Sequence, residues 1–200
     1  MNQVYTQLSI DQRGVANLVL NRPEVHNAFD NLMIAELIQV LDNLARNDQV
    51  KVLLLSANGK NFSAGADLNW MRSMAEKDYE QNLDDANELA TLMHKLDKFS
   101  KPTIAMDTAK ALGLLHEVVS ASELPQQADA LAEQLLQNSP AAMSAAKALI
   151  HNIYNRKISN NVVAHTTQAI AEIRVSDEGQ EGLSAFLEKR RPNWLAPKPQ

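Results

Sequence analysis

The chain has 200 residues, of which 45% are hydrophobic and 22% are charged, and this balance is typical of an ordinary folded protein. Its formal net charge is -5 and its longest basic run is Lys189–Arg191, so the sequence predicts no nucleic-acid partner. The absence of cysteine excludes disulfides, thiolate metal sites and a cysteine nucleophile. We predict a cytoplasmic protein without a membrane partner, because the N-terminal residues match no leader pattern and no apolar run approaches about 18 residues.

The first part of the chain has the pattern of two strands followed by a helix. Residues 4–10 and 15–20 are rich in apolar and β-branched residues, and the polar stretch Asp11–Gly14 between them predicts a hairpin. Asn21–Pro23 should end the second strand, since proline has no amide hydrogen, and Asp30 is the predicted N-cap of a helix. The apolar residues at helical spacing are Met33, Leu37, Val40, Leu41 and Leu44.

The strand and helix pattern then repeats. Val52–Leu55 predicts a strand that is buried on both faces of a sheet, and residues 61–68 form a turn of small residues suited to a close backbone approach. A long helix is predicted over residues 78–98 and a further strand over 103–106, so the order of elements indicates an α/β fold. The predicted apolar face of the long helix consists of Leu83, Ala86, Ala90, Met93 and Leu96.

The second part of the chain is predicted to be almost entirely helical. Asp107–Gly113 has the pattern of a short capped helix that follows the strand without a loop, and a strand is predicted over Leu115–Val119. Further helices are predicted over residues 123–137, 140–156, 160–174 and 178–190. We therefore expect an α/β part at residues 1–106, a helical part at 107–195 and a frayed tail at 196–200.

Several motifs, taken in order, resemble the enoyl-CoA hydratase/isomerase (crotonase) family. The first three are Asn21–Pro23, Asn27–Phe29 and Gly59–Leu68. The C-terminal matches are Thr108–Leu114, Val118–Val119, Ser139–Pro140, Lys147, Glu181–Gly182, Ala185–Phe186, Glu188–Arg190, Pro192 and Trp194. The stretch Asp67–Arg72 further resembles the branch that acts on methylglutaconyl-CoA or carboxygeranoyl-CoA.

The resemblance implies a fold class, an activity and partners. It implies an α/β fold with a crotonase-like ββα spiral core, truncated, and an all-helical C-terminal region. It also implies a lyase or isomerase that hydrates or isomerises a 2-enoyl-CoA, as in fatty acid metabolism or leucine catabolism, with coenzyme A as part of the substrate and no other cofactor and no metal. The family usually forms trimers or hexamers through its C-terminal helices, so a homo-oligomer is expected.

The resemblance also assigns a loop that would hold the thioester. The family stabilises a thioester enolate with two backbone N–H donors, and by resemblance the amide of Ala66 is the first. The small residues Ala64, Gly65 and Ala66 would let the pantetheine arm lie against the backbone. Asp67 and Leu68 would border the adenine end of coenzyme A.

Further contacts with coenzyme A are implied by residues outside this loop. His26 and Asn27 match positions beside the pyrophosphate, although a solvated loop histidine is an equally good interpretation of His26. Phe186 and Lys189 match positions that reach the adenine and phosphates, often from a neighbouring subunit. On periodicity alone, Phe186 would be a core residue and Lys189 a solvated one.

The sequence departs from the family after the strand near residue 103. There the family has a Gly-rich turn that supplies the second oxyanion donor, followed by elements that bear two catalytic glutamates. Here Ala105–Met106 runs directly into Asp107, so neither the second donor nor an acid or base can be assigned. Losing one oxyanion donor typically costs about a hundredfold to a thousandfold in rate, and losing general acid-base groups about a hundredfold to ten-thousandfold.

Three hypotheses therefore stay open: an impaired enzyme, a pseudoenzyme that binds coenzyme A or joins full-length relatives, and a partly folded deletion product. An RNA-binding role is a remote fourth, since the chain lacks a basic patch. Other ionisable residues offer no substitute site. The acidic residues of the long helix are expected to be solvated, Asp107 is expected to be an N-cap, and His94, His116, His151 and His165 lack the spacing of metal ligands.

Overall fold

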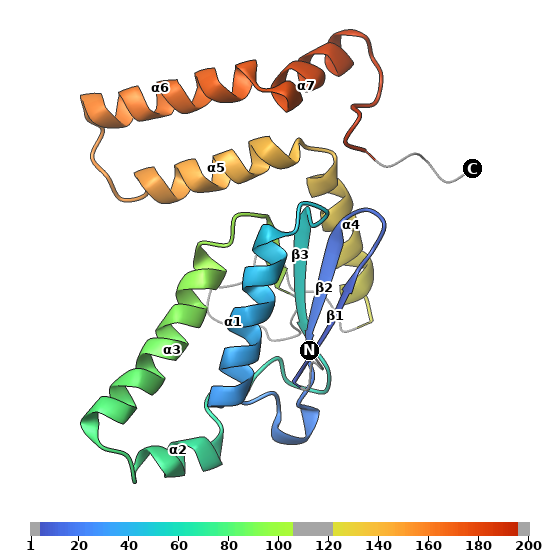
Figure 1. The fold of residues 1–200 in the computed structure, drawn as a ribbon. Coiled ribbons are helices and arrows are strands. Elements are labelled where there is room, and N and C mark those ends of the chain that lie inside the picture. The colour runs from blue at the N-terminus through green and yellow to red at the C-terminus, as the bar shows by residue number, and fades with distance from the viewer. Residues whose placement is uncertain (1–4, 106–121, 196–200) are drawn as a thin grey trace.

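The computed structural model describes residues 5–105 and 122–195, which form a sheet, helices on both of its faces and a helical arm (Figure 1). The strands are β1 (Thr6–Ile10), β2 (Val15–Leu20), β3 (Val52–Ala57) and β4 (Thr103–Ala105). They lie in the order β1-β2-β3-β4, with β1 antiparallel to β2 and the other neighbours parallel. This topology confirms the predicted hairpin and the predicted α/β order of elements.

The hairpin between β1 and β2 is fixed by its own polar residues. The Asp11 carboxylate accepts hydrogen bonds from the N–H groups of Arg13 and Val15, at 2.9 and 3.0 Å. Gly14 has a φ of +90°, and a Cβ atom there would lie 2.4 Å from the carbonyl oxygen of Gln49. Only glycine therefore fits this turn as it is built.

Two layers of helices cover the sheet. Helices α1 (Asn31–Arg46) and α3 (Tyr79–Asp97) lie side by side on one face, and α4 (Leu124–Leu136) lies on the other (Figure 1). Along β3, Leu53 belongs to the cluster beneath α1 and α3, whereas Val52 and Leu54 belong to the cluster beneath α4. The alternation follows the two-residue period of a strand and confirms that β3 is buried on both faces.

Helix α1 matches its prediction. Asp30 accepts a hydrogen bond from the Met33 N–H at 2.8 Å and caps the helix. The five predicted core residues, Met33, Leu37, Val40, Leu41 and Leu44, are all buried.

Of the predicted apolar face of α3, only Leu96 is confirmed, and the prediction was wrong for Leu83, Ala86, Ala90 and Met93. Leu92 is fully buried, Leu89 and Leu96 pack against the core, and Leu83 and Met93 are 39% and 46% exposed. The real face follows the large leucines, because an alanine contributes little apolar area and the first turns of α3 extend past the sheet (Figure 1).

The C-terminal helices form an arm beyond one end of the sheet (Figure 1). They are α5 (Pro140–Ile153), α6 (Asn160–Val175) and α7 (Asp177–Leu187), and they are capped by Ser139, Ser159 and Ser176. Two short elements complete the described part, the 3-10 helix η1 (Pro23–Val25) and helix α2 (Leu68–Met74). Over residues 5–105 and 122–195, no helix has both the length and the apolar character needed to cross a bilayer.

The predicted short helix at residues 107–113 and the predicted strand at 115–119 lie outside the described residues, as do Asp107 and His116.

Candidate functional site

The loop of residues 61–68 is fastened to the segment that follows η1 by a parallel bridge between Phe29 and Ala66. Phe29 donates its N–H to the Gly65 carbonyl at 2.7 Å, and Asp67 donates its N–H to the Phe29 carbonyl at 2.8 Å. In a parallel bridge these two bonds come from the residues on either side of Ala66, so the N–H of Ala66 itself points away from Phe29. Within the described residues this N–H has no acceptor, and Ala66 is exposed.

The ledge formed by Ala64, Gly65 and Ala66 faces open space. All three residues are exposed. Gly65 has a φ of +90°, and no described atom lies within 4 Å of the place where its Cβ would stand. Among the described residues, packing therefore does not require a small side chain at position 65, where the positive φ alone favours glycine. The exposed backbone of the ledge leaves room for a ligand to lie along it.

Asn27 holds the segment that leads into the ledge. Its side chain is completely buried, and its amide nitrogen donates to the carbonyls of Asn58 and Asn61, both at 2.8 Å. Its side-chain oxygen accepts the N–H of Arg22 at 2.7 Å. The structure thus gives Asn27 a supporting role for the loop. The neighbouring His26 is exposed, and its carbonyl, which accepts the Ala64 N–H at 3.0 Å, makes its one hydrogen bond to the loop in the part of the chain that the structure describes.

Asp67 and Leu68 differ sharply in exposure. Asp67 is 7% exposed, and its carboxylate accepts the N–H groups of Asn69 and Trp70 at 2.8 and 3.3 Å, which caps α2. Leu68 is 67% exposed. Of this pair, only Leu68 presents its side chain to a ligand.

Arg22 is a site residue that sequence reasoning missed. Its Nη1 donates to the Ala28 carbonyl at 2.9 Å and pairs with Asp30 at 2.8 Å, while its Nη2 pairs with Asp67 at 3.4 Å. The signal in the sequence was an arginine between an apolar strand and a proline, where a solvated charge is not expected, followed by an aspartate before each of two helices.

The structure does not bring Phe186 and Lys189 to the ledge of the same chain. They lie at the end of α7, in the arm, whereas α2 and the loop before it lie at the opposite end of the sheet (Figure 1). Lys51, just before β3, donates to the Trp194 carbonyl at 2.7 Å, which fixes the end of the arm at the start of that strand. Phe186 is 80% exposed, so the interpretation of it as a core residue was wrong, and Lys189 is exposed.

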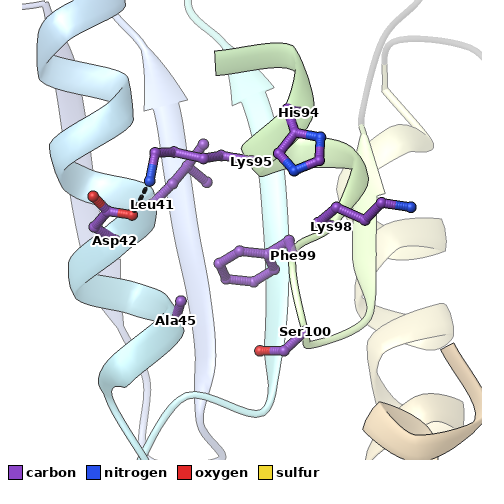
Figure 2. A pocket seen from close by; sticks show the side chains of 8 residues that line it. All are labelled: Leu41, Asp42, Ala45, His94, Lys95, Lys98, Phe99 and Ser100. Atoms are coloured by element: carbon purple, nitrogen blue, oxygen red, sulfur yellow. Dashed lines mark hydrogen bonds and ion pairs between the residues drawn. The ribbon is translucent and has the colours of Figure 1, made fainter. Parts of the chain in front are cut away.

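A pocket of about 220 Å³ lies between the C-terminal ends of α1 and α3 (Figure 2). Its lining consists of Leu41, Asp42, Ala45, His94, Lys95, Lys98, Phe99 and Ser100. None of these belongs to the ledge, and two of them, Asp42 and Lys95, form an ion pair at 2.5 Å (Figure 2). Because small-molecule pockets usually hold about 300 to 1,000 Å³ and this one lies at the far end of α1 from Asp30, it is not the candidate site.

The fold matches that of solved enoyl-CoA hydratases. One from Shewanella pealeana is 38% identical with a TM-score of 0.90, and the match covers 96% of each chain. A putative enoyl-CoA hydratase/isomerase (crotonase) from Legionella pneumophila is 33% identical with a TM-score of 0.84, covering 95% of this chain and 98% of the other. The architecture is therefore that of the crotonase fold.

The family model for enoyl-CoA hydratase/isomerase matches residues 11–108 and, separately, residues 104–197. The chain belongs to this family. A putative enoyl-CoA hydratase from Thermus thermophilus is 24% identical over an alignment of 253 positions, gaps included, which covers 94% of this chain and all of the relative. Since this chain has 200 residues, the relative contains residues that have no counterpart here.

Proposed function

We propose that this protein binds the coenzyme A part of an acyl-CoA thioester along the ledge of Ala64, Gly65 and Ala66 and the adjoining Asp67 and Leu68, and that it hydrates or isomerises 2-enoyl-CoA only weakly. The observation that carries the proposal is the outward N–H of Ala66, which is exposed and has no acceptor among the described residues. A rigid backbone donor of this kind is suited to the oxygen of a thioester, where negative charge develops in an enolate.

The weakness of turnover is inferred from the carboxylates beside the ledge. Asp30 and Asp67 directly follow the two bridged residues, yet each caps a helix and pairs with Arg22. A carboxylate held in this way is a poor general acid or base, because its lone pairs are already occupied.

We place the proposed missing segment where the two family matches overlap, at residues 104–108, a range that begins within β4. By resemblance, the second oxyanion donor and the catalytic glutamates belong there. Their combined loss corresponds to a rate at least about ten-thousandfold below that of a full-length relative.

A protein that binds acyl-CoA without turnover is the second candidate. It is favoured because Asp30 and Asp67 are both engaged in a helix cap and in an ion pair with Arg22. The ledge would then bind a thioester beside carboxylates that are not free to transfer a proton. The two candidates are separated by rate alone.

The acyl group and the assembly are also part of the proposal. The stretch Asp67–Arg72 favours a branched or isoprenoid acyl group, in keeping with leucine or isoprenoid-acid catabolism in the cytoplasm. The exposed apolar side chains of the arm, such as Ile158 and Val175 at 89% and 77% exposure, support a trimer or hexamer. In that assembly Phe186 and Lys189 of a neighbouring copy would reach the adenine and phosphates.

The first test is a thermal melt with and without acetyl-CoA. A ligand present at about a hundred times its Kd and bound only to the native state adds about 2.7 kcal/mol, which raises the Tm by about 5 to 10 °C for a chain of this size. The absence of a cooperative transition would instead favour a partly folded deletion product. A cooperative transition whose Tm does not change with acetyl-CoA would contradict the binding proposal.

Two variants locate the binding. Ala66→Leu places a bulky side chain on the exposed ledge and should abolish the acetyl-CoA shift while the ligand-free Tm changes little. Ala86→Leu is the matched control, because Ala86 is an exposed alanine on α3, away from the ledge, and it should keep the full shift.

A turnover assay then separates the two candidates. Slow loss of the enoyl thioester absorbance of crotonyl-CoA that is abolished by Ala66→Leu supports a weak enzyme. Binding with no loss above the uncatalysed rate supports the protein without turnover.

A further inference from the structure

Arg22 joins the two helix caps that border the ledge. One carboxylate oxygen of Asp30 accepts the Met33 N–H of α1 at 2.8 Å, and the other pairs with Arg22, also at 2.8 Å. One carboxylate oxygen of Asp67 likewise accepts the Asn69 N–H of α2, and the other pairs with Arg22 at 3.4 Å. Each aspartate therefore caps its helix with one oxygen and pairs with the arginine through the other.

The caps sit directly after the two bridged residues. Asp30 follows Phe29 and Asp67 follows Ala66, while the Ala28 carbonyl, which precedes Phe29, also accepts from Arg22 at 2.9 Å. The guanidinium thus holds both chains of the bridge at adjacent positions. A rotation of the peptide group of Ala66 would pull Asp67 away from Arg22.

The group is buried, so water cannot replace these contacts easily. The side chain of Arg22 is 12% exposed, and those of Asp30 and Asp67 are 16% and 9% exposed. The Tyr5 ring covers the guanidinium, with its centroid 5.0 Å from Cζ. Removing the arginine would leave the buried carboxylate of Asp67 and the partly buried carboxylate of Asp30 without their cation, which disfavours the arrangement.

We propose that Arg22 is a positioning residue, which sets the direction of the Ala66 N–H by joining the caps of α1 and α2. The inference rests on the proposed function of the ledge, since only a ligand at Ala66 makes this direction matter.

The test combines backbone amide exchange with acetyl-CoA binding in Arg22→Met. Met keeps most of the length of the side chain but has no donor. The N–H groups of Phe29 and Asp67 form the bridge, and their exchange should accelerate by about tenfold relative to the amides of the β2 and β3 ladder. The acetyl-CoA shift in Tm should be lost or greatly reduced.

Asp67→Asn is the second variant and guards against a simple failure to fold. Asparagine can still cap α2 through its side-chain oxygen but cannot form the ion pair with Arg22. It should reproduce the faster exchange of the bridge amides and weaken acetyl-CoA binding. Arg22→Lys should fall between Arg22→Met and the wild type, because a lysine cannot hold both carboxylates and the Ala28 carbonyl together.

Arg13→Met is the matched control. Arg13 also pairs with several carboxylates, those of Asp11, Asp129 and Glu133, but it does so in the β1–β2 hairpin and against α4. This variant should leave the relative exchange of the bridge amides and the acetyl-CoA shift unchanged.

The outcomes distinguish the two proposals. If the wild type shows no acetyl-CoA shift, the proposed function is wrong, and the exchange rates still decide whether Arg22 holds the bridge. If the wild type binds, and Arg22→Met and Asp67→Asn bind equally well with unchanged exchange, the positioning role is overturned and the proposed function stands.

Discussion

The α/β part and the helical arm are built on different principles. Beneath α1 and α3, side chains such as Leu18, Met33 and Leu53 are completely buried. Among the described residues of α5 and α6 none is buried, and in α7 only Ala185 is. The sheet and its covering helices can therefore fold around their own core, whereas the arm cannot hold its shape through apolar burial within this chain.

Polar contacts attach the arm to the α/β part and join its own segments instead. Lys147 in α5 donates to the Lys101 carbonyl at 3.1 Å, and Glu178 in α7 accepts from the Ser139 hydroxyl at 2.6 Å. The Arg190 guanidinium forms two hydrogen bonds with Glu181, at 2.6 and 2.8 Å. Such contacts fix orientation more than they add stability, since each partner is well solvated when released.

The largest expected effect is in the core. Leu53→Ala should lower the free energy of unfolding by about 2 to 5 kcal/mol, because it opens a cavity beneath α1 and α3. Urea unfolding followed by circular dichroism measures the change. Leu183→Ala in the arm, where the side chain is 55% exposed, is the control and should change it by no more than about 0.5 kcal/mol. Equal losses in the two variants would contradict the contrast between the regions.

Asn27→Ala should have the next largest effect. It removes the buried donor that holds the carbonyls of Asn58 and Asn61 and places alanine at a φ of 53°, so we expect a loss of about 1 to 3 kcal/mol. The acetyl-CoA shift should fall as well, because the loop loses its support. A variant as stable as the wild type would show that the loop is held from elsewhere.

A smaller loss is expected at the end of α1. Lys101 donates to the carbonyls of Leu44 and Asn47, which close the last turn of that helix. Lys101→Met should cost about 1 kcal/mol in chemical unfolding. Lys98→Met is a suitable comparison, since Lys98 is exposed and pairs only with Asp97 among the described residues, and it should be close to neutral.

The smallest effect should appear at acid pH in the C-terminal strap, residues 188–195. Hydrogen bonds from Arg190 lower the pKa of Glu181 from 4.5 to about 2. Because the folded pKa is the lower one, the stabilising contribution of Glu181 is complete above about pH 4.5 and is lost as the pH falls toward 2.

Fluorescence of Trp194 in a Trp70→Phe background would report this release. Glu181→Gln should loosen the strap already at neutral pH and remove the acid transition. An acid transition that persists in Glu181→Gln would assign it to another group.

The sequence predicted α1 well, because its cap and its core face depend only on residues within one helix. Asp30 and the apolar residues that follow it need no distant partner to be interpreted. The apolar face of α3 was predicted wrongly for the opposite reason. Several faces of the helix have apolar residues, and packing against α1 and the core selected the face with Leu89, Leu92 and Leu96.

The site was predictable only in part. The small-residue loop could be located from its motif, but the role of Arg22 could not be predicted from the motif Asn21–Pro23, because its partners Asp30 and Asp67 are 8 and 45 residues away along the chain. The exposure of Phe186 had a similar cause. Periodicity assumes that a helix has a core to face, and α7 has almost none in this chain.

The bridge between Phe29 and Ala66 has a genetic consequence. The donor at position 66 belongs to the backbone, so every substitution there except proline preserves it, and an alanine scan cannot detect it. Mutations that silence the donor will instead be found at its supports, Arg22, Asn27 and Asp67, none of which needs to touch a ligand. A screen for lost binding should therefore give hits at these supports, whereas hits at position 66 itself should come only from bulky residues, such as leucine, that block the ledge.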